Sequence, residues 1–222
     1  MVDINEVYEN VQSLAQKAKH GTIRVVDFNR YANLSSIDLF NERIGSVRDY
    51  YRLQKAINKM TPGMNKEVDQ SIRPFFVENT SIAMTAGKGT IPTDCELLDT
   101  VMFGTKAVKW IPFNKIASYL NSTIDVPTVD YPVYSDLATQ LIAYPSSMTP
   151  LLLSYYKTPQ TVNWGYTMSG SIPVYNVGAS VNFEWFATEK IQLIMRILAY
   201  VGITIRDSEL VQYATVEENT IA

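Results

Sequence analysis

The stretch NFEWFATEKIQLIMRILAYVGITIRDSELVQYAT, residues 182–215, contains both patterns on which the fold class depends. In its first part Phe183 and Trp185 alternate with polar neighbours, the period of two that is typical of a β-strand. From Thr188, the expected N-cap, the period changes to that of a helix. Gly202 is expected to end this helix, because glycine adopts a left-handed backbone without steric cost. The stretch therefore predicts a strand followed by a helix.

The helix after Thr188 is more apolar than an exposed helix requires. With about fourteen residues it would reach only about 21 Å, too short to cross a bilayer. It must therefore be covered by protein, from its own chain or from a neighbour. Asp207 or Ser208 is expected to cap a short second helix. The apolar face consists of Ile191, Leu193, Ile194, Ile197, Leu198 and Val201.

Residues 1–60 are expected to be helical. Apolar residues recur at helical spacing from Ile4 to Ala18, with Asp3 as the expected N-cap and Gly21 as the end of the helix. The helices expected next are Asp27–Asn33, a helix capped by Ser35 or Ser36 and broken at Gly45, and Val47–Met60.

Residues 61–187 consist of short apolar runs broken by Pro, Gly, Asn and Ser, the pattern of a β-rich domain. Pro112–Asn121 interrupts this pattern and is expected to be a short helix. The expected strands are Ser71–Glu78, Thr80–Ala86, Leu97–Phe103, Ala107–Ile111, Thr128–Tyr134, Gln140–Tyr144, Leu151–Lys157 and Ser171–Trp185, the last split by Gly178.

The predicted fold class is therefore α+β. A helical region (1–60) is followed by a central antiparallel β-rich domain (61–187), for which the sequence leaves sandwich and barrel open. A C-terminal helix pair and tail (188–222) is expected to pack against that domain, so that the chain forms one compact unit.

The composition favours a component of an assembly. Of the 222 residues, 46% are hydrophobic and only 18% are charged, against a typical charged share of about 25%. The net charge of −3 gives no support to a basic nucleic-acid footprint. Cys95, the single cysteine, excludes an internal disulfide and fits synthesis in a reducing compartment. The N-terminal residues lack the pattern of a secretory signal.

No catalytic, cofactor or metal residues are predicted. The sequence Gly87-Lys88-Gly89-Thr90 lacks the spacing of a phosphate-binding loop and is interpreted as a tight turn between two strands. His20 and Cys95 lie far apart and cannot form a zinc site by themselves. Carboxylate-only hydrolysis stays open as a minor alternative, because two acids can meet from anywhere in a sequence. The available acids are Asp94, Glu96, Asp99, Asp125, Asp130 and Asp136.

Several short phrases follow one another over roughly residues 26–215. They are Val26–Asn33 with Asp38–Asn41, Gly87–Gly89 with Ile91-Pro92-Thr93-Asp94, Val126-Pro127-Thr128 with Tyr131-Pro132, Ile142–Pro145, Tyr155–Pro159 with Trp164-Gly165-Tyr166, and Phe183-Glu184-Trp185 through Glu209–Ala214. In this order they resemble neck proteins of tailed bacteriophages, most of all the portal-proximal ring proteins of crAss-like phages. Cys95 stands where the family pattern usually has Tyr.

The resemblance implies a structural virion protein rather than an enzyme. Such a protein forms a twelve-fold ring in the neck, binds the portal protein and an adjacent neck ring or tail protein, and extends the channel through which double-stranded DNA passes without sequence-specific contact. It would be made in the cytoplasm of the host bacterium, with no membrane partner. The residues expected at subunit interfaces are Tyr50, Tyr51, Ile57, Gly87, Lys88, Ile91, Ile194, Leu198 and Val201.

The alternative from another class is a non-enzymatic β-rich binding module, a tail or capsid decoration that recognises a glycan or peptide. It would require an exposed aromatic platform, for which Trp164 and Tyr166 are the candidates.

Overall fold

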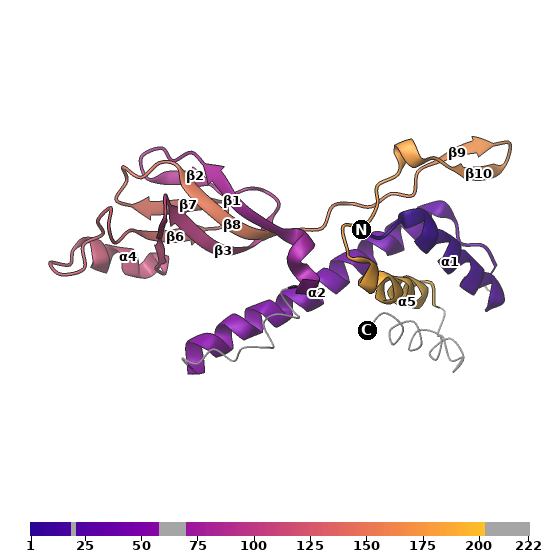
Figure 1. Cartoon of the computed structure of the whole chain (residues 1–222), viewed down its shortest axis with the longest axis horizontal. Coiled ribbons are helices and arrows are strands. Elements are labelled where there is room, and N and C mark those ends of the chain that lie inside the picture. Colours follow the sequence, from indigo (N-terminus) through magenta and orange to yellow (C-terminus); the bar gives the residue numbers. More distant parts are fainter. Residues whose placement is uncertain (19–20, 58–69, 203–222) are drawn as a thin grey trace. The chain divides into compact units, whose positions relative to one another are not determined.

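The computed structural model describes residues 1–18, 21–57 and 70–202, with the side chains of residues 50–57 left out. The chain divides into two units, a helical unit (Met1–Pro74 with Pro159–Ala222) and a β unit (Phe75–Thr158). Each unit is described by itself. Helices and antiparallel-rich sheets are both present, which confirms the α+β fold class (Figure 1).

Helix α1 (Ile4–Lys17) begins as the sequence predicts. Asp3 is its N-cap, and its Oδ1 accepts hydrogen bonds from the backbone N–H groups of Asn5 (2.7 Å) and Glu6 (3.1 Å). The helix buries one apolar face, formed by Ile4, Val7, Val11 and Ala15. His20 lies outside the described residues.

Helix α2 (Val25–Ile57) is one continuous helix, where the sequence predicted three shorter ones. Gly45 does not break it, although glycine within a helix costs about 1 kcal/mol relative to alanine. The adjacent side chains of Ile44 and Val47 are 1% and 6% exposed, and their burial offsets that cost. Ser36 is not a cap, because it lies mid-helix and its Oγ accepts from the indole N–H of Trp185 at 2.9 Å.

Helix α5 (Lys190–Tyr200) follows a short 3-10 helix, η3 (Ala187–Glu189). Thr188 therefore lies within η3 and is not the N-cap. The predicted end at Gly202 is confirmed by the positive φ of 83° at that residue. The helix expected after Asp207 or Ser208 lies outside the described residues.

Helix α5, expected to pack against the β-rich domain, belongs to the helical unit and packs there on α2 and α1. Its fully buried residues are Leu193, Ile197 and Leu198. Charged pairs border this contact: a guanidinium nitrogen of Arg43 lies 3.1 Å from Oε2 of Glu189, and Arg196 pairs with Glu42. The apolar face of α5 is thus covered within the helical unit.

Between the β unit and α5, the chain from 159 to 189 belongs to the helical unit. It contains the hairpin β9 (Tyr166–Ser169) and β10 (Ile172–Tyr175) and a 3-10 helix, η2 (Val177–Ala179). The expected strand Ser171–Trp185 is therefore regular only over β10. Phe183 and Trp185 are nevertheless fully buried, as their alternation indicated.

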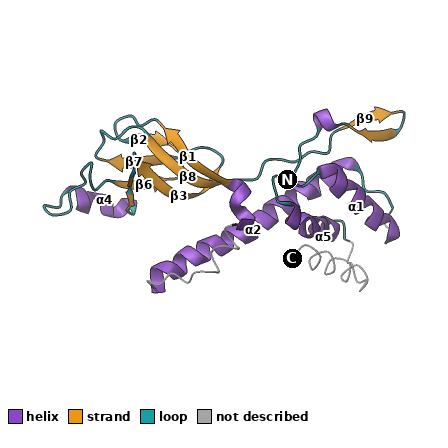
Figure 2. Cartoon of the chain, in the orientation of Figure 1, coloured by secondary structure: helices purple, strands orange, loops and turns teal. Residues whose placement is uncertain are grey.

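The β unit contains two four-stranded sheets (Figure 2). One has the order β1-β8-β3-β4 and the other β2-β7-β6-β5, and only β5–β6 is parallel. Helix α4 (Phe113–Leu120) confirms the short helix predicted there. The bounds of the strands are β1 Phe76–Ile82, β2 Lys88–Thr90, β3 Cys95–Phe103, β4 Lys106–Ala107, β5 Lys109–Trp110, β6 Val133–Leu137, β7 Gln140–Tyr144 and β8 Leu151–Lys157.

The two sheets share one core, as in a sandwich. Val101 and Leu153 come from the first sheet, Tyr134 and Leu141 from the second, and all are at most 6% exposed. Burial raises the pKa of the Tyr134 hydroxyl well above its ordinary value.

The β unit is shorter than the domain predicted at 61–187. It begins at Phe75, the last residue of the 3-10 helix η1 (Arg73–Phe75), and ends at Thr158. The pairs Phe76↔Tyr156 and Cys95↔Lys157 mark the end of its ladders. Beyond Thr158 the side chains contact α1 and α2 instead, which short strand-like runs in the sequence could not indicate.

Candidate functional site

Several strongly exposed apolar residues in the described part of the helical unit lie in the hairpin β9–β10, whose base is fixed by Trp164. The Trp164 ring, 3% exposed, stacks on Tyr8 of α1 with centroids 4.2 Å apart. Its indole N–H donates to Oδ1 of Asn5 at 2.9 Å. Tyr166 and Tyr175, at the start of β9 and the end of β10, lie 6.0 and 5.5 Å from the Trp164 ring. Trp164 therefore attaches the hairpin to α1.

Two asparagines of α2 form hydrogen bonds with the extended segment 162–164, which leads into the hairpin. The Asn33 amide bonds the backbone of Val162 in both directions, donating to its carbonyl (2.9 Å) and accepting from its N–H (2.8 Å). Asn29 accepts from the N–H of Trp164 at 2.8 Å and donates to Oδ1 of Asn163 at 2.9 Å. Together with the antiparallel bridge Asn163↔Val181, these side-chain amides satisfy the backbone groups of the segment.

Gly165 permits the close approach that closes the base. A Cβ at this position would lie 2.4 Å from the backbone carbonyl carbon and oxygen of Ala179, a distance that no side chain can occupy. The carbonyl of Gly165 accepts from the N–H of Asn176 at 2.9 Å, and its N–H donates to Oγ of Ser180 at 2.9 Å. The base of the hairpin is therefore closely packed where Gly165 lies against Ala179.

The rest of the hairpin is exposed on both faces. Met168 is 59% exposed, Ile172 68% and Val174 47%. Figure 1 shows β9 and β10 as a hairpin that extends beyond the helices of its own unit. A two-stranded hairpin by itself is only marginally stable in water, and this one carries apolar side chains where a surface is ordinarily charged.

The sequence contains a signal for this hairpin that the interface prediction did not use. Between Lys157 and Glu184 there is no charged residue and no histidine. Exposed strands are commonly protected by charged side chains. An uncharged run of this length at exposed positions indicates a surface that another protein covers.

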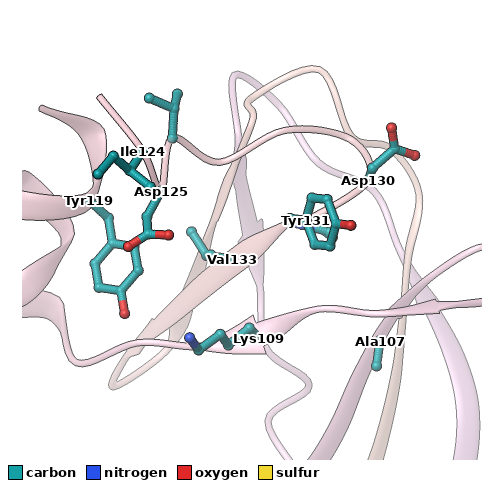
Figure 3. Close-up of a pocket in the computed structure, with 10 residues that line it drawn as sticks. Ala107, Lys109, Tyr119, Ile124, Asp125, Asp130, Tyr131 and Val133 are labelled. Carbon is teal, nitrogen blue, oxygen red and sulfur yellow. The ribbon is translucent and has the colours of Figure 1, made fainter. Parts of the chain in front are cut away.

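The β unit has a cavity of about 400 Å³ beside α4 (Figure 3). Its lining combines exposed apolar side chains with charged ones: Ile124 is 90% exposed and Tyr131 80%. The lining residues are Ala107, Lys109, Tyr119, Ile124, Asp125, Val126, Asp130, Tyr131, Pro132 and Val133.

Two of the six candidate acids line this cavity, on different sides of it. Figure 3 shows Asp125 beside Tyr119 and the carboxylate of Asp130 directed away from Asp125. Asp130 forms an ion pair with Lys106, and this hydrogen bond lowers the pKa of the Asp130 carboxyl. Within the described residues no group of His, Cys, Asp and Glu is arranged to hold a metal ion.

Asp94 and Asp136, outside the cavity, bind neutral donors. Oδ1 of Asp94 accepts from the hydroxyl of Tyr155 at 3.1 Å, and Oδ1 of Asp136 accepts from the indole N–H of Trp110 at 2.6 Å. Beside Asp94, burial is the first cause that raises the pKa of the Cys95 thiol to about 11. Cys95 is thus a weakly reactive thiol.

Six of the predicted interface residues lie in or next to helices α2 and α5. Tyr50, Tyr51 and Ile57 lie in α2, but their side chains are outside the described part. Leu198 is fully buried within the subunit, so that it is not available to a neighbour, and this prediction is wrong. Ile194 and Val201 are partly exposed on α5 and stay predictions.

Those predicted in the β unit lie at or shortly after one turn. The backbones of Thr85 and Lys88 exchange hydrogen bonds of 2.8 and 3.0 Å, so the tight turn lies at Ala86 and Gly87, whereas Lys88–Thr90, predicted as part of the turn, forms strand β2. Ala86 and Gly87 both have positive φ, as a two-residue hairpin turn of type I′ requires. Gly87 is buried and Lys88 exposed, while Ile91 packs partly against the core of the sandwich.

The aromatic platform required by the binding-module alternative is absent at the predicted residues. Trp164 is buried under Tyr8, and only Tyr166, 40% exposed, reaches the surface.

Phrases that resemble phage neck proteins contact one another across the sequence. In the helical unit, Asn29 of the first phrase bonds Trp164 of the fifth. In the β unit, Asp94 of the second phrase bonds Tyr155 and accepts from the N–H of Thr158 at 2.8 Å. The phrases therefore include residues that fix the two units internally.

Neither a scan of protein-family models nor a search of curated proteins gave a match to this chain. No helix in the described part of the chain is both long enough and apolar enough to span a membrane.

Proposed function

We propose that the protein is a structural component of a phage neck and forms an oligomeric ring between portal and tail. The hairpin β9–β10 is the observation that carries this proposal. Its base is fixed by Trp164, Asn29 and Asn33, whereas its exposed residues are apolar and uncharged. Such an arm fits a protein whose surface is completed by neighbours.

The resemblance to ring proteins of crAss-like phages implies that the subunits assemble into a closed ring. A closed ring is built from heterologous contacts, in which one surface of a subunit meets a different surface of the next. Of the phrases that carry the resemblance, the first and fifth contribute Asn29 and Trp164 to the hairpin base, and the second and fifth contribute Asp94 and Tyr155 to a hydrogen bond of the β unit.

The channel role is supported by charge. A subunit with a net charge of −3 does not attract DNA phosphates over its whole surface. DNA could therefore pass through such a ring without being retarded. A ring whose bore proved strongly basic would contradict this part of the proposal.

The test is the mass of the purified full chain in solution, alone and mixed with a purified portal ring of a crAss-like phage. A discrete twelve-fold species, alone or only on the portal, is expected. A chain that stays monomeric up to high concentration and does not bind the portal would overturn the proposal.

The binding-module alternative has less support, because Trp164 is used inside the fold and is not available to a glycan. An array of immobilised glycans is the direct comparison. Saturable binding that is lost in Tyr166→Ala, by a chain that forms no ring, would favour that alternative.

A further inference from the structure

The hairpin β9–β10 has two different apolar faces. The cross-strand partners are Tyr166↔Tyr175, Thr167↔Val174, Met168↔Pro173 and Ser169↔Ile172. Partners share a face of the sheet, and successive residues alternate between faces. We call one the tyrosine face (Tyr166, Met168, Pro173 and Tyr175) and the other the valine face (Thr167, Ser169, Ile172 and Val174).

Each face leaves apolar area in solvent. On the tyrosine face Met168 is 59% exposed, beyond the part held by Trp164, and on the valine face Ile172 is 68% exposed. A two-fold dimer would cover only one kind of face, because both copies use the same patch. A ring gives every subunit two neighbours, and two different faces are what it requires.

The charge of the hairpin indicates its partner. A charged surface placed against the hairpin would lose water without gaining a counter-charge, which is costly. The run from 158 to 183 is itself uncharged. A second copy of the hairpin therefore matches it in charge as well as in apolar character.

Backbone pairing along the edge of β10 is not favoured as the mode of contact. β10 contains Pro173, which has no N–H to donate to an added strand. The exposed apolar side chains lie instead on the two faces, which can pack face to face as in stacked sheets about 10 Å apart.

We propose that the hairpin is the contact between neighbouring subunits, with the tyrosine face of one copy packed on the valine face of the hairpin of the next. This inference rests on the proposed ring function and names the surface that closes the ring.

The test compares the full chain with Ile172→Glu, Met168→Lys and the double variant, by mass photometry over a concentration series, alone and on the portal ring. Ile37→Glu is the matched control, because Ile37 of α2 is 47% exposed and lies outside the hairpin. Each single hairpin variant is expected to raise the concentration for half-assembly at least tenfold, and the control to leave it unchanged. Circular dichroism of each variant checks that the fold is retained.

The double variant tests the arrangement of the faces. Met168 and Ile172 lie on opposite faces of their own hairpin, so the introduced ammonium can meet the introduced carboxylate only across a subunit contact. Partial recovery of assembly is expected. Single variants that break the ring without recovery in the double variant would overturn the face-to-face packing.

The two proposals fail in different ways. If the wild-type chain forms a ring and both single hairpin variants assemble as the wild type does, the hairpin inference is wrong and the ring function stands. If the wild-type chain forms no ring, alone or on the portal, both proposals fall.

Discussion

The helical unit and the β unit hold extended chain in different ways. In the β unit, neighbouring strands satisfy the backbone, as β8 does between β1 and β3. In the helical unit, side-chain amides do so: Asn33 bonds Val162 in both directions, and Gln12 does the same for Ile23, at 2.6 and 3.0 Å. Side-chain amides of a helix can thus satisfy the backbone N–H and C=O groups of an extended segment without a neighbouring strand. The stability of such a segment then depends on single side chains.

The largest effect is expected at Trp185 of the helical unit. Trp185 is fully buried and donates to Ser36, so Trp185→Ala should lower the free energy of unfolding of that unit by about 3–5 kcal/mol. Denaturant titration followed by circular dichroism measures this. Trp110→Ala is the control, because Trp110 of the β unit is 47% exposed. An equal loss in both variants would contradict the separate cores.

Cys95 gives the β unit its own probe. With a thiol pKa of about 11, its alkylation by iodoacetamide at pH 8 should be about a hundredfold slower than that of an exposed thiol with the ordinary pKa of 9.0. The raised pKa stabilises the folded β unit below the unfolded pKa, and this contribution is lost as the pH rises through the folded pKa. Trp185→Ala should leave the alkylation rate unchanged. A rate equal to that of an exposed thiol would show that the β unit opens at Cys95.

A smaller effect is expected at the base of the hairpin. Gly165→Ala places a Cβ against the backbone of Ala179 and should cost about 1–3 kcal/mol. Gly178→Ala is the control, because its Cβ would meet only Oδ1 of Asn176, at 3.4 Å. Thermal unfolding of both variants makes the comparison. Equal midpoints would mean that the base is not closely packed.

The smallest effect is expected at the Lys106–Asp130 ion pair on the surface of the β unit. Lys106→Met removes the hydrogen bond that lowers the pKa of Asp130, so that this pKa should rise toward its ordinary value. The pair stabilises the fold above the unfolded pKa of Asp130, and this contribution is lost as the pH falls through the folded pKa. A titration followed by NMR measures the shift. An unchanged pKa would show that the pair does not form in solution.

Much of the local structure could be predicted, because its causes lie within a few residues. Gln140–Tyr144 and Leu151–Lys157 are strands with the predicted bounds, and Asp3 caps α1 as expected. The exposed hairpin was not among the residues predicted at an interface, because apolar strand residues in a sequence indicate burial as readily as exposure. Leu198 was assigned to an interface because its helical face was known but not what covers that face.

By itself, the sequence determined the fold class, the type of most elements, the N-cap at Asp3 and the helix end at Gly202, since periodicity, capping and backbone preference are local. Only the tertiary structure decided that α2 continues through Gly45, that α5 packs on α1 and α2, and that the chain after Thr158 returns to the helical unit. Burial of Ile44 and Val47, and the amides of Asn29 and Asn33, decide these features. Such contacts join residues far apart in the chain, and no local pattern specifies which surfaces will meet.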